Sequence, residues 1–154
     1  MIERRETEMD RRKEAKLLAA MAQNLGCQYK QNPNTHKYKI DGWFYQPSKN
    51  DPDKGKIIGW AECKWYNKKA HFYINPPKYA ELVQLCQITK LSGYFIFRES
   101  GRWGYMILHD GISASARFQT VLAGGTPPNR TPNDDDIEPL LQLNEQEAIW
   151  VHEG

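Results

Sequence analysis

The stretch IIGWAECKW, residues 57–65, predicts a buried β-strand that ends in two charged side chains. Its first half is apolar at every position, which is typical of a central strand that is covered on both faces. Glu62 and Lys64 are two residues apart, so both side chains are expected on one face of the strand. Charges at the end of an apolar strand are costly to bury, which favours a functional role. The alternative is a solvated pair that contributes little to stability.

A second strand is predicted from residues 36–46, HKYKIDGWFYQ, in which apolar and polar residues alternate. Tyr38, Ile40 and Phe44 are expected on one face, and Lys37, Lys39, Asp41 and Trp43 on the other. Residues 46–56 are rich in turn formers and are predicted to be a loop between the two strands. The strands are therefore expected to pair antiparallel, which would bring Asp41 close to Glu62.

The remaining segments predict the order of elements around this pair. Helices are predicted at residues 3–25, ended by Gly26, and from Pro76 through Leu91, ended by Gly93; strands at residues 93–98 and 102–109, joined by a turn; short helices at residues 112–123 and 137–147; and a loop at residues 124–136. A strand, a helix and another strand in succession favour a parallel crossover. The predicted fold class is therefore α/β, with a mixed sheet of about four to five strands flanked by helices in the order α-β-β-α-β-β.

Length and charge limit the classes of function. A chain of 154 residues is expected to form one domain over residues 1–154, which is long enough to bury one core. Within it we expect a core over residues 10–109 and a C-terminal extension over residues 110–154, which contains the loop at 124–136 as a flexible segment. The net charge is only +2, so nucleic acid would be contacted by a local basic patch rather than by bulk charge.

Cysteine usage and the N-terminal residues indicate the compartment. The three cysteines are an odd number and include no CxxC pair, which favours free thiols in a reducing compartment. The N-terminal residues are densely charged, unlike a signal peptide, and no apolar run approaches the roughly 20 residues that span a bilayer. We therefore expect a cytoplasmic protein of a bacterial host or a phage, with no membrane partner.

The carboxylates predict a metal site. Two carboxylates that meet at one point repel each other unless a cation lies between them, and Mg²⁺ prefers oxygen ligands and keeps several waters. Asp41 and Glu62 are the predicted ligands, and the backbone carbonyl of Cys63 is a further candidate. The Cys63 side chain is expected on the opposite face, as a small buried residue. Lys64 would orient or help deprotonate the attacking water, or offset charge in the transition state.

The pattern D-(x20)-E-x-K, after a helix and before a helix and two strands, resembles the PD-(D/E)xK nuclease superfamily. That superfamily has the restriction endonuclease-like fold and includes restriction enzymes, Holliday-junction resolvases, VRR-NUC domains and many phage nucleases. The resemblance covers roughly residues 10–109. It implies that Asp41 and Glu62 hold Mg²⁺, for which Mn²⁺ can substitute, and that Lys64 serves catalysis.

The same resemblance implies an acidic residue near the metal in the first helix. Glu14 matches best, because it borders the apolar stripe of that helix, and Glu6 and Asp10 are weaker matches. The chain also departs from the pattern at two places. Ile40 precedes Asp41 where the pattern has proline, and Lys78 stands about where some members carry a glutamine at the start of the second helix.

Lysines interleaved with aromatic residues surround the ExK motif, which is typical of a surface that binds phosphates and stacks on bases. The predicted nucleic-acid contacts are Lys37, Lys39, Trp65, Tyr66, Lys68, Lys69 and Lys78. The alternative is that Trp65 belongs to the core and that Lys68 and Lys69 form a solvated turn. Phosphate contacts carry no sequence information, so structure-directed or weakly sequence-specific cleavage is favoured.

The leading hypothesis is a metal-dependent endonuclease that hydrolyses phosphodiester bonds in duplex or branched DNA. The first alternative is a catalytically silent nucleic-acid-binding or assembly protein on the same fold. The second is an RNA-directed nuclease, because the same metal chemistry serves both substrates. Nucleases of this fold commonly act as dimers, so a homodimer is a possible oligomeric state, which the sequence does not determine.

Overall fold

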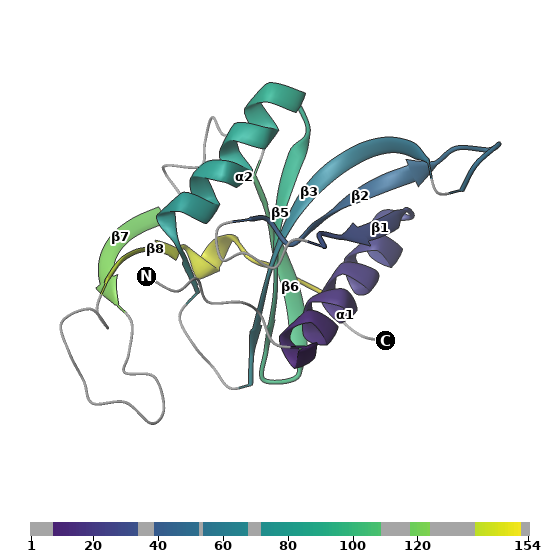
Figure 1. Ribbon diagram of the computed structural model, residues 1–154. Helices are drawn as coiled ribbons and strands as arrows, with labels where there is room; N and C mark the ends of the chain where they lie inside the picture. Colours follow the sequence, from purple (N-terminus) through teal and green to yellow (C-terminus); the bar gives the residue numbers. More distant parts are fainter. Residues whose placement is uncertain are drawn as a thin grey trace.

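The chain folds around a large mixed sheet and a smaller second sheet, shown in Figure 1. In this computed structural model the described residues are 8–33, 39–52, 54–67, 72–108, 118–123 and 138–151. The elements are α1 (Glu8–Leu25), β1 (Gln28–Gln31), β2 (Gly42–Pro47), β3 (Gly55–Tyr66), β4 (Tyr73–Ile74), α2 (Pro76–Thr89), β5 (Ser92–Glu99), β6 (Arg102–Leu108), β7 (Phe118–Ala123), β8 (Glu138–Leu143), the 3₁₀ turn η3 (Glu145–Glu147) and β9 (Ile149–Val151). The six-stranded sheet has the order β1-β2-β3-β5-β6-β9, and the second sheet has the order β4-β8-β7.

The centre of the large sheet pairs as predicted. β2 and β3 are antiparallel, β3 and β5 are parallel neighbours joined through α2, and β5 and β6 form an antiparallel hairpin. β3 is the long central strand, and the buried residues on it include Gly59, Ala61, Glu62 and Cys63. The prediction of an α/β fold with a mixed sheet is confirmed. The sheet also gains β1 and β9, which were not predicted.

Helix α1 covers one face of this sheet. Its buried side chains Leu17, Leu18 and Met21 pack against a cluster that includes Phe44 from β2 and Ile96 from β5. The helix ends before Gly26, as predicted, and Gly26 has the left-handed φ of 71° that glycine adopts without strain. The first predicted residues of this helix lie outside the described ranges.

Helix α2 packs on the opposite face, where Leu82 and Cys86 meet Leu108 of β6. It starts at Pro76, as predicted, and ends at Thr89, where Lys90 takes a left-handed φ of 60°. The prediction that Gly93 ends this helix is therefore wrong. Gly93 lies in β5, where an added Cβ would meet the Cys86 sulfur at 2.8 Å, so glycine allows the helix to approach the strand.

The predicted strand over residues 36–46 is shorter in the structure and differs in its faces. Strand β2 begins only at Gly42, and Asp41 lies directly before it. Phe44 packs under α1, whereas Ile40 packs with Leu82 on the α2 side. Alternation between faces holds only inside a regular strand, so the face predicted for Ile40 was wrong. Tyr38 and Lys37 lie outside the described residues.

The two short helices predicted near the C-terminus are strands over Phe118–Ala123 and Glu138–Leu143, and within the described part of the second only the 3₁₀ turn Glu145–Glu147 is helical. β7 and β8 form an antiparallel pair, and β8 also pairs with β4. Leu141 and Leu143 both pack against the cluster that contains Phe72 and Phe97, which is the period of two that a strand requires. Pairing with β4, far away in sequence, outweighed the local pattern that suggested a helix.

The C-terminal segment is part of the core rather than an appendage to it. Leu143 is 2% exposed, and Trp150 stacks edge-on against Phe97 at 5.1 Å between ring centroids. Strand β9 then extends the large sheet beyond β6. Among the described residues, no helix is long and apolar enough to cross a membrane.

Candidate active site

The Asp41 carboxylate is fixed at the edge where β2 begins. The Asp41 N–H donates to the Ala61 carbonyl at 3.1 Å, which continues the β2–β3 pairing by one residue. The Asp41 Oδ2 atom accepts a hydrogen bond from the Cys63 N–H at 2.7 Å. β3 continues past the start of β2, so the Cys63 N–H bonds to the Asp41 side chain instead of to a backbone carbonyl of β2. Asp41 is thereby held beside Glu62, the residue between its two backbone partners.

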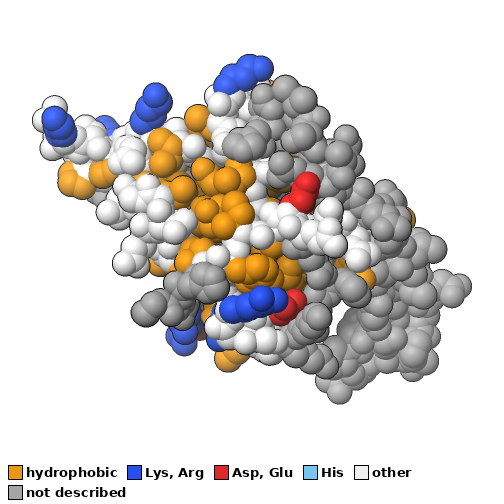
Figure 2. All heavy atoms as spheres, turned by 180° about the vertical axis from the view of Figure 1, so that it is seen from behind, with side chains coloured by type: hydrophobic (Ala, Val, Ile, Leu, Met, Phe, Trp, Pro, Cys, Tyr) orange, Lys and Arg blue, Asp and Glu red, His pale blue; other side chains and the backbone are white. Residues whose placement is uncertain are grey.

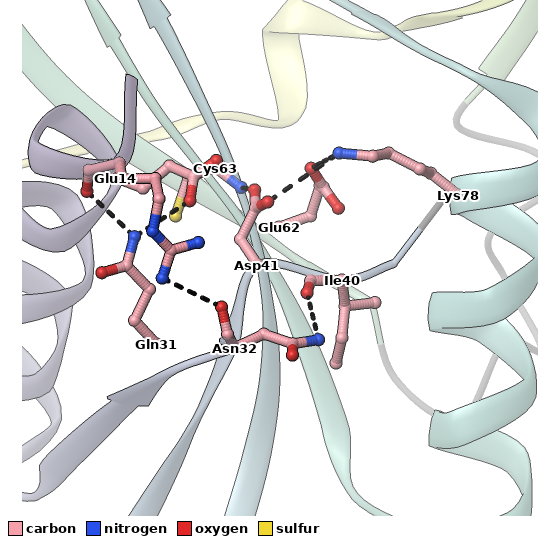
Figure 3. A network of polar contacts seen from close by, with 9 residues as sticks. Glu14, Gln31, Asn32, Ile40, Asp41, Glu62, Cys63 and Lys78 are labelled. Atoms are coloured by element: carbon pink, nitrogen blue, oxygen red, sulfur yellow. Dashed lines mark hydrogen bonds and ion pairs between the residues drawn. The ribbon is translucent and has the colours of Figure 1, made fainter. Parts of the chain in front are cut away.

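Lys78 reaches the two carboxylates from the first turn of α2 (Figure 3). Its Nζ donates to Glu62 Oε1 at 2.9 Å and lies 3.8 Å from Asp41 Oδ1. All three residues are buried, with exposed fractions of 5% for Asp41, 0% for Glu62 and 8% for Lys78. Two carboxylates and one ammonium therefore meet in the interior. Glu62 comes from β3, Asp41 from the residue before β2, and Lys78 from α2.

Burial raises the pKa of the Glu62 carboxyl group well above its usual range, and the negative charge of Asp41 raises it further. The positive charges of Lys78 and Lys64 act in the opposite direction. The second oxygen, Glu62 Oε2, is buried and has no hydrogen-bond partner among the described residues. A buried acceptor of this kind is costly, and its lone pairs are available to a cation.

Lys64 lies two residues beyond Glu62 on the same strand, so both side chains belong to the same face, as predicted. Its charge lowers the pKa of Glu62, which indicates electrostatic contact with the site. Lys64 is half-buried. Within the described ranges it makes no ion pair with Asp41 or Glu62; Lys78 holds that position instead.

Cys63 contributes its backbone to the site and its side chain to the core. The thiol is buried in the cluster under α1, on the face away from Glu62, as predicted. Burial raises the pKa of the Cys63 thiol well above its usual range, so the thiol is a poor nucleophile. The N–H and C=O of one strand residue point to the same edge, so the Cys63 carbonyl is turned toward the Asp41 side.

Glu14 lies on the other side of Asp41 from Lys78 in Figure 3. Its Oε2 accepts a hydrogen bond from Gln31 Nε2 at 3.1 Å, which links α1 to β1. Its charge is felt at the Cys63 thiol, whose pKa it helps to raise. Glu14 is thus close to the Cys63 end of the site, and its role as a further metal ligand stays a prediction.

The aromatic residues predicted to stack on bases have partners within the protein. The Arg98 guanidinium lies over the Trp65 ring at 4.4 Å from its centroid, and the Lys13 ammonium lies at 5.8 Å. Tyr66 stacks on Phe72 at 5.4 Å. Lys13 and Arg98 therefore pack against Trp65, which was not predicted from the sequence. Both side chains are half-buried.

The predicted lysine contacts are only partly described. Lys39 is exposed, Lys78 is buried against the carboxylates, and Lys37, Lys68 and Lys69 lie outside the described residues. On the face drawn in Figure 2, the described Lys and Arg side chains lie apart from one another, around a central hydrophobic area. The described Lys and Arg side chains on that face therefore surround the hydrophobic area, and phosphate binding there stays a prediction.

Sequence reasoning placed Asp41, Glu62 and Lys64 together but missed the ion pairs of Lys78. The available signal was its position just after Pro76 and Pro77, at the start of a helix that returns across β3. Among the described residues, no three His, Cys, Asp or Glu side chains are grouped to hold a metal ion. Any metal here would need backbone or water ligands beside the two carboxylates.

No family model, no curated protein and no solved structure matches this chain.

Proposed function

We propose that this protein is a metal-dependent endonuclease of the PD-(D/E)xK type, with a restriction endonuclease-like core, which hydrolyses phosphodiester bonds in DNA. The observation that carries the proposal is the pair of buried carboxylates, Asp41 and Glu62, with Glu62 Oε2 left without a partner. Buried carboxylates side by side destabilise a fold, and this arrangement is favoured when the carboxylates bind a cation.

The donor set fits Mg²⁺, with Mn²⁺ as a substitute. Asp41 and Glu62 would supply two carboxylate oxygens, the Cys63 carbonyl would supply a backbone oxygen, and water would complete the shell. When both carboxylates are ionised, their two negative charges exceed the one positive charge of Lys78, so the site can accept more positive charge. When bound, the metal supplies a Lewis acid for the phosphate and an activated water.

The residues of the chain orient the reaction. The Cys63 N–H holds the Asp41 carboxylate in one position, which reduces the reorganisation needed on binding. Lys64, on the same strand face as Glu62, adds a positive charge that would bind the scissile phosphate or hold the attacking water. The half-buried cations Lys13 and Arg98, beside Trp65, would contact phosphates farther along the bound DNA strand.

A second candidate function is a catalytically silent nucleic-acid-binding protein. Lys78 already neutralises part of the carboxylate pair, at 2.9 Å from Glu62 and 3.8 Å from Asp41. If that ammonium permanently replaces a metal, the fold needs no cation and would perform no hydrolysis. This candidate predicts that Mg²⁺ and Mn²⁺ do not bind to the folded protein.

The test compares the original protein with the Glu62→Gln variant. The measurement is the rate at which each protein nicks and cleaves DNA in the presence of Mg²⁺. We expect at least about a hundredfold loss of cleavage, because the variant removes one charged ligand. The matched control is Glu8→Gln, the same chemical change at an exposed position on α1, which should cleave as the original protein does. Undiminished cleavage by a folded Glu62→Gln protein would contradict the proposal.

A further inference from the structure

We infer that Lys78 is a resident counter-ion, whose ammonium neutralises Asp41 and Glu62 in the absence of metal and is displaced when a divalent metal binds to both carboxylates. This inference rests on the proposed metal site and adds its regulation. The ammonium donates to Glu62 Oε1 at 2.9 Å and lies 3.8 Å from Asp41 Oδ1, so it contacts both carboxylates from the α2 side (Figure 3). A metal bound by both carboxylates would need the same space.

The local sequence does not explain why Lys78 is buried there. Lys78 lies in the first turn of α2, where the helix dipole is positive and disfavours a cation. That first turn contains no acidic residue to compensate. A buried lysine is costly unless it is paired. The carboxylates on the sheet are therefore what holds the ammonium in the interior.

The pairing is incomplete, which is what makes exchange favourable. One ammonium faces two carboxylates, and Glu62 Oε2 has no partner among the described residues. A divalent cation carries twice the charge and can accept oxygen ligands from both residues at once. The lysine side chain has a flexible four-carbon stem, so its ammonium can leave without movement of the helix backbone.

The exchange has two consequences for the protein. Without metal, Lys78 protects the fold from the repulsion of two bare carboxylates. With metal, the ammonium must leave, so the observed metal affinity is lowered by the cost of breaking its contacts. Removing the ammonium should therefore tighten metal binding while weakening the metal-free fold.

The test is calorimetric titration of Mn²⁺ into the full chain and into two variants, Lys78→Met and Lys64→Met. Each variant removes one positive charge near Glu62, but only Lys78 touches both carboxylates. We expect Lys78→Met to bind Mn²⁺ at least about tenfold more tightly than the original protein. Lys64→Met, at a half-buried and more screened position, should change the affinity by less than about threefold.

A second measurement uses the unaltered protein, in case Lys78→Met fails to fold. The lysines are acetylated briefly with acetic anhydride, either in EDTA or in saturating Mn²⁺. The acetylated fraction of Lys78 is then measured by mass spectrometry. We expect Lys78 to be protected in EDTA and to react several-fold faster with Mn²⁺. Lys90, exposed at the end of α2, is the internal reference and should react equally in both conditions.

The outcomes separate this inference from the proposed function. Tighter Mn²⁺ binding by Lys78→Met, or exposure of Lys78 on Mn²⁺ binding, supports the exchange. Mn²⁺ binding that is unchanged in Lys78→Met, with Lys78 still protected, overturns the exchange and leaves the metal site standing. Absence of Mn²⁺ binding in every folded protein overturns both the exchange and the metal site.

Discussion

The Glu62 carboxyl group is fully buried, and burial followed by the charge of Asp41 raises its pKa well above the usual range. Between the ordinary glutamate pKa and the raised one, the folded chain holds a proton that the unfolded chain has released. The contribution of Glu62 to the free energy of unfolding is therefore fully present below the ordinary glutamate pKa, and it is lost as the pH rises through the raised pKa. We expect metal-free protein to lose stability across this interval.

The measurement is urea unfolding in EDTA at pH values from the ordinary glutamate pKa up to neutrality. Glu62→Gln cannot ionise, so its stability should decline less over the same interval. The exposed substitution Glu8→Gln should leave the decline unchanged. Parallel pH curves for the original protein and Glu62→Gln would show that Glu62 is not the titrating group.

At this scale the sequence predicted part of the site. The spacing of Glu62 and Lys64 on a strand predicted their common face, and the antiparallel pair predicted the approach of Asp41. The contact from Lys78 was not predictable in the same way. The two prolines placed Lys78 at the start of a helix, but the contact also depends on how α2 crosses the sheet and on the reach of a long side chain, which leave no local pattern in the sequence.

At the scale of elements, α2 determines where Lys78 stands, and Gly93 determines how closely α2 approaches the sheet. An added Cβ at Gly93 would lie 2.8 Å from the Cys86 sulfur and 3.1 Å from Leu82 Cδ1. We expect Gly93→Ala to lower the free energy of unfolding by about 1–3 kcal/mol, because a well-packed core has no room for the extra carbon. Urea unfolding measures this loss.

The control is a double-mutant cycle with Cys86→Ala, which removes the sulfur that Gly93→Ala would meet. The double variant should be more stable than the sum of the two single losses predicts, with a coupling of about 1 kcal/mol. Additive losses would mean that Gly93 and Cys86 are not in contact.

Elements with strong local signals were the ones predicted. The helical stripe of α1, the two prolines that begin α2, and the apolar runs of β3, β5 and β6 are all visible over short windows. The strands β1, β4 and β9 were missed because each is only a few residues long and is defined by its partner. β7 and β8 were predicted as helices because their pairing with each other and with β4 joins segments far apart in sequence.

At the scale of the whole molecule, the C-terminal segment closes the core on the α2 side of the sheet. Leu143 packs with Phe72, Phe97 and Met106, and it is almost completely buried. We expect Leu143→Ala to lower the free energy of unfolding by about 3 kcal/mol, from lost burial and the cavity that remains. The control Ile149→Ala, at a residue that is 44% exposed on β9, should lose less than about 1 kcal/mol. A loss for Leu143→Ala as small as the one expected for Ile149→Ala would mean that the C-terminal segment is peripheral to the core.

The most direct test of the nuclease assignment is cleavage of a substrate panel by the whole protein. The panel contains linear duplex DNA, single-stranded DNA, a four-way branched DNA and RNA, each with Mg²⁺, Mn²⁺ or EDTA. We expect DNA to be cut with either metal and not in EDTA. We also expect Lys64→Ala to lose the cutting, because Lys64 supplies the positive charge beside the two carboxylates. Failure of the folded protein to cut any substrate with any metal would contradict the assignment and would favour a silent binding protein.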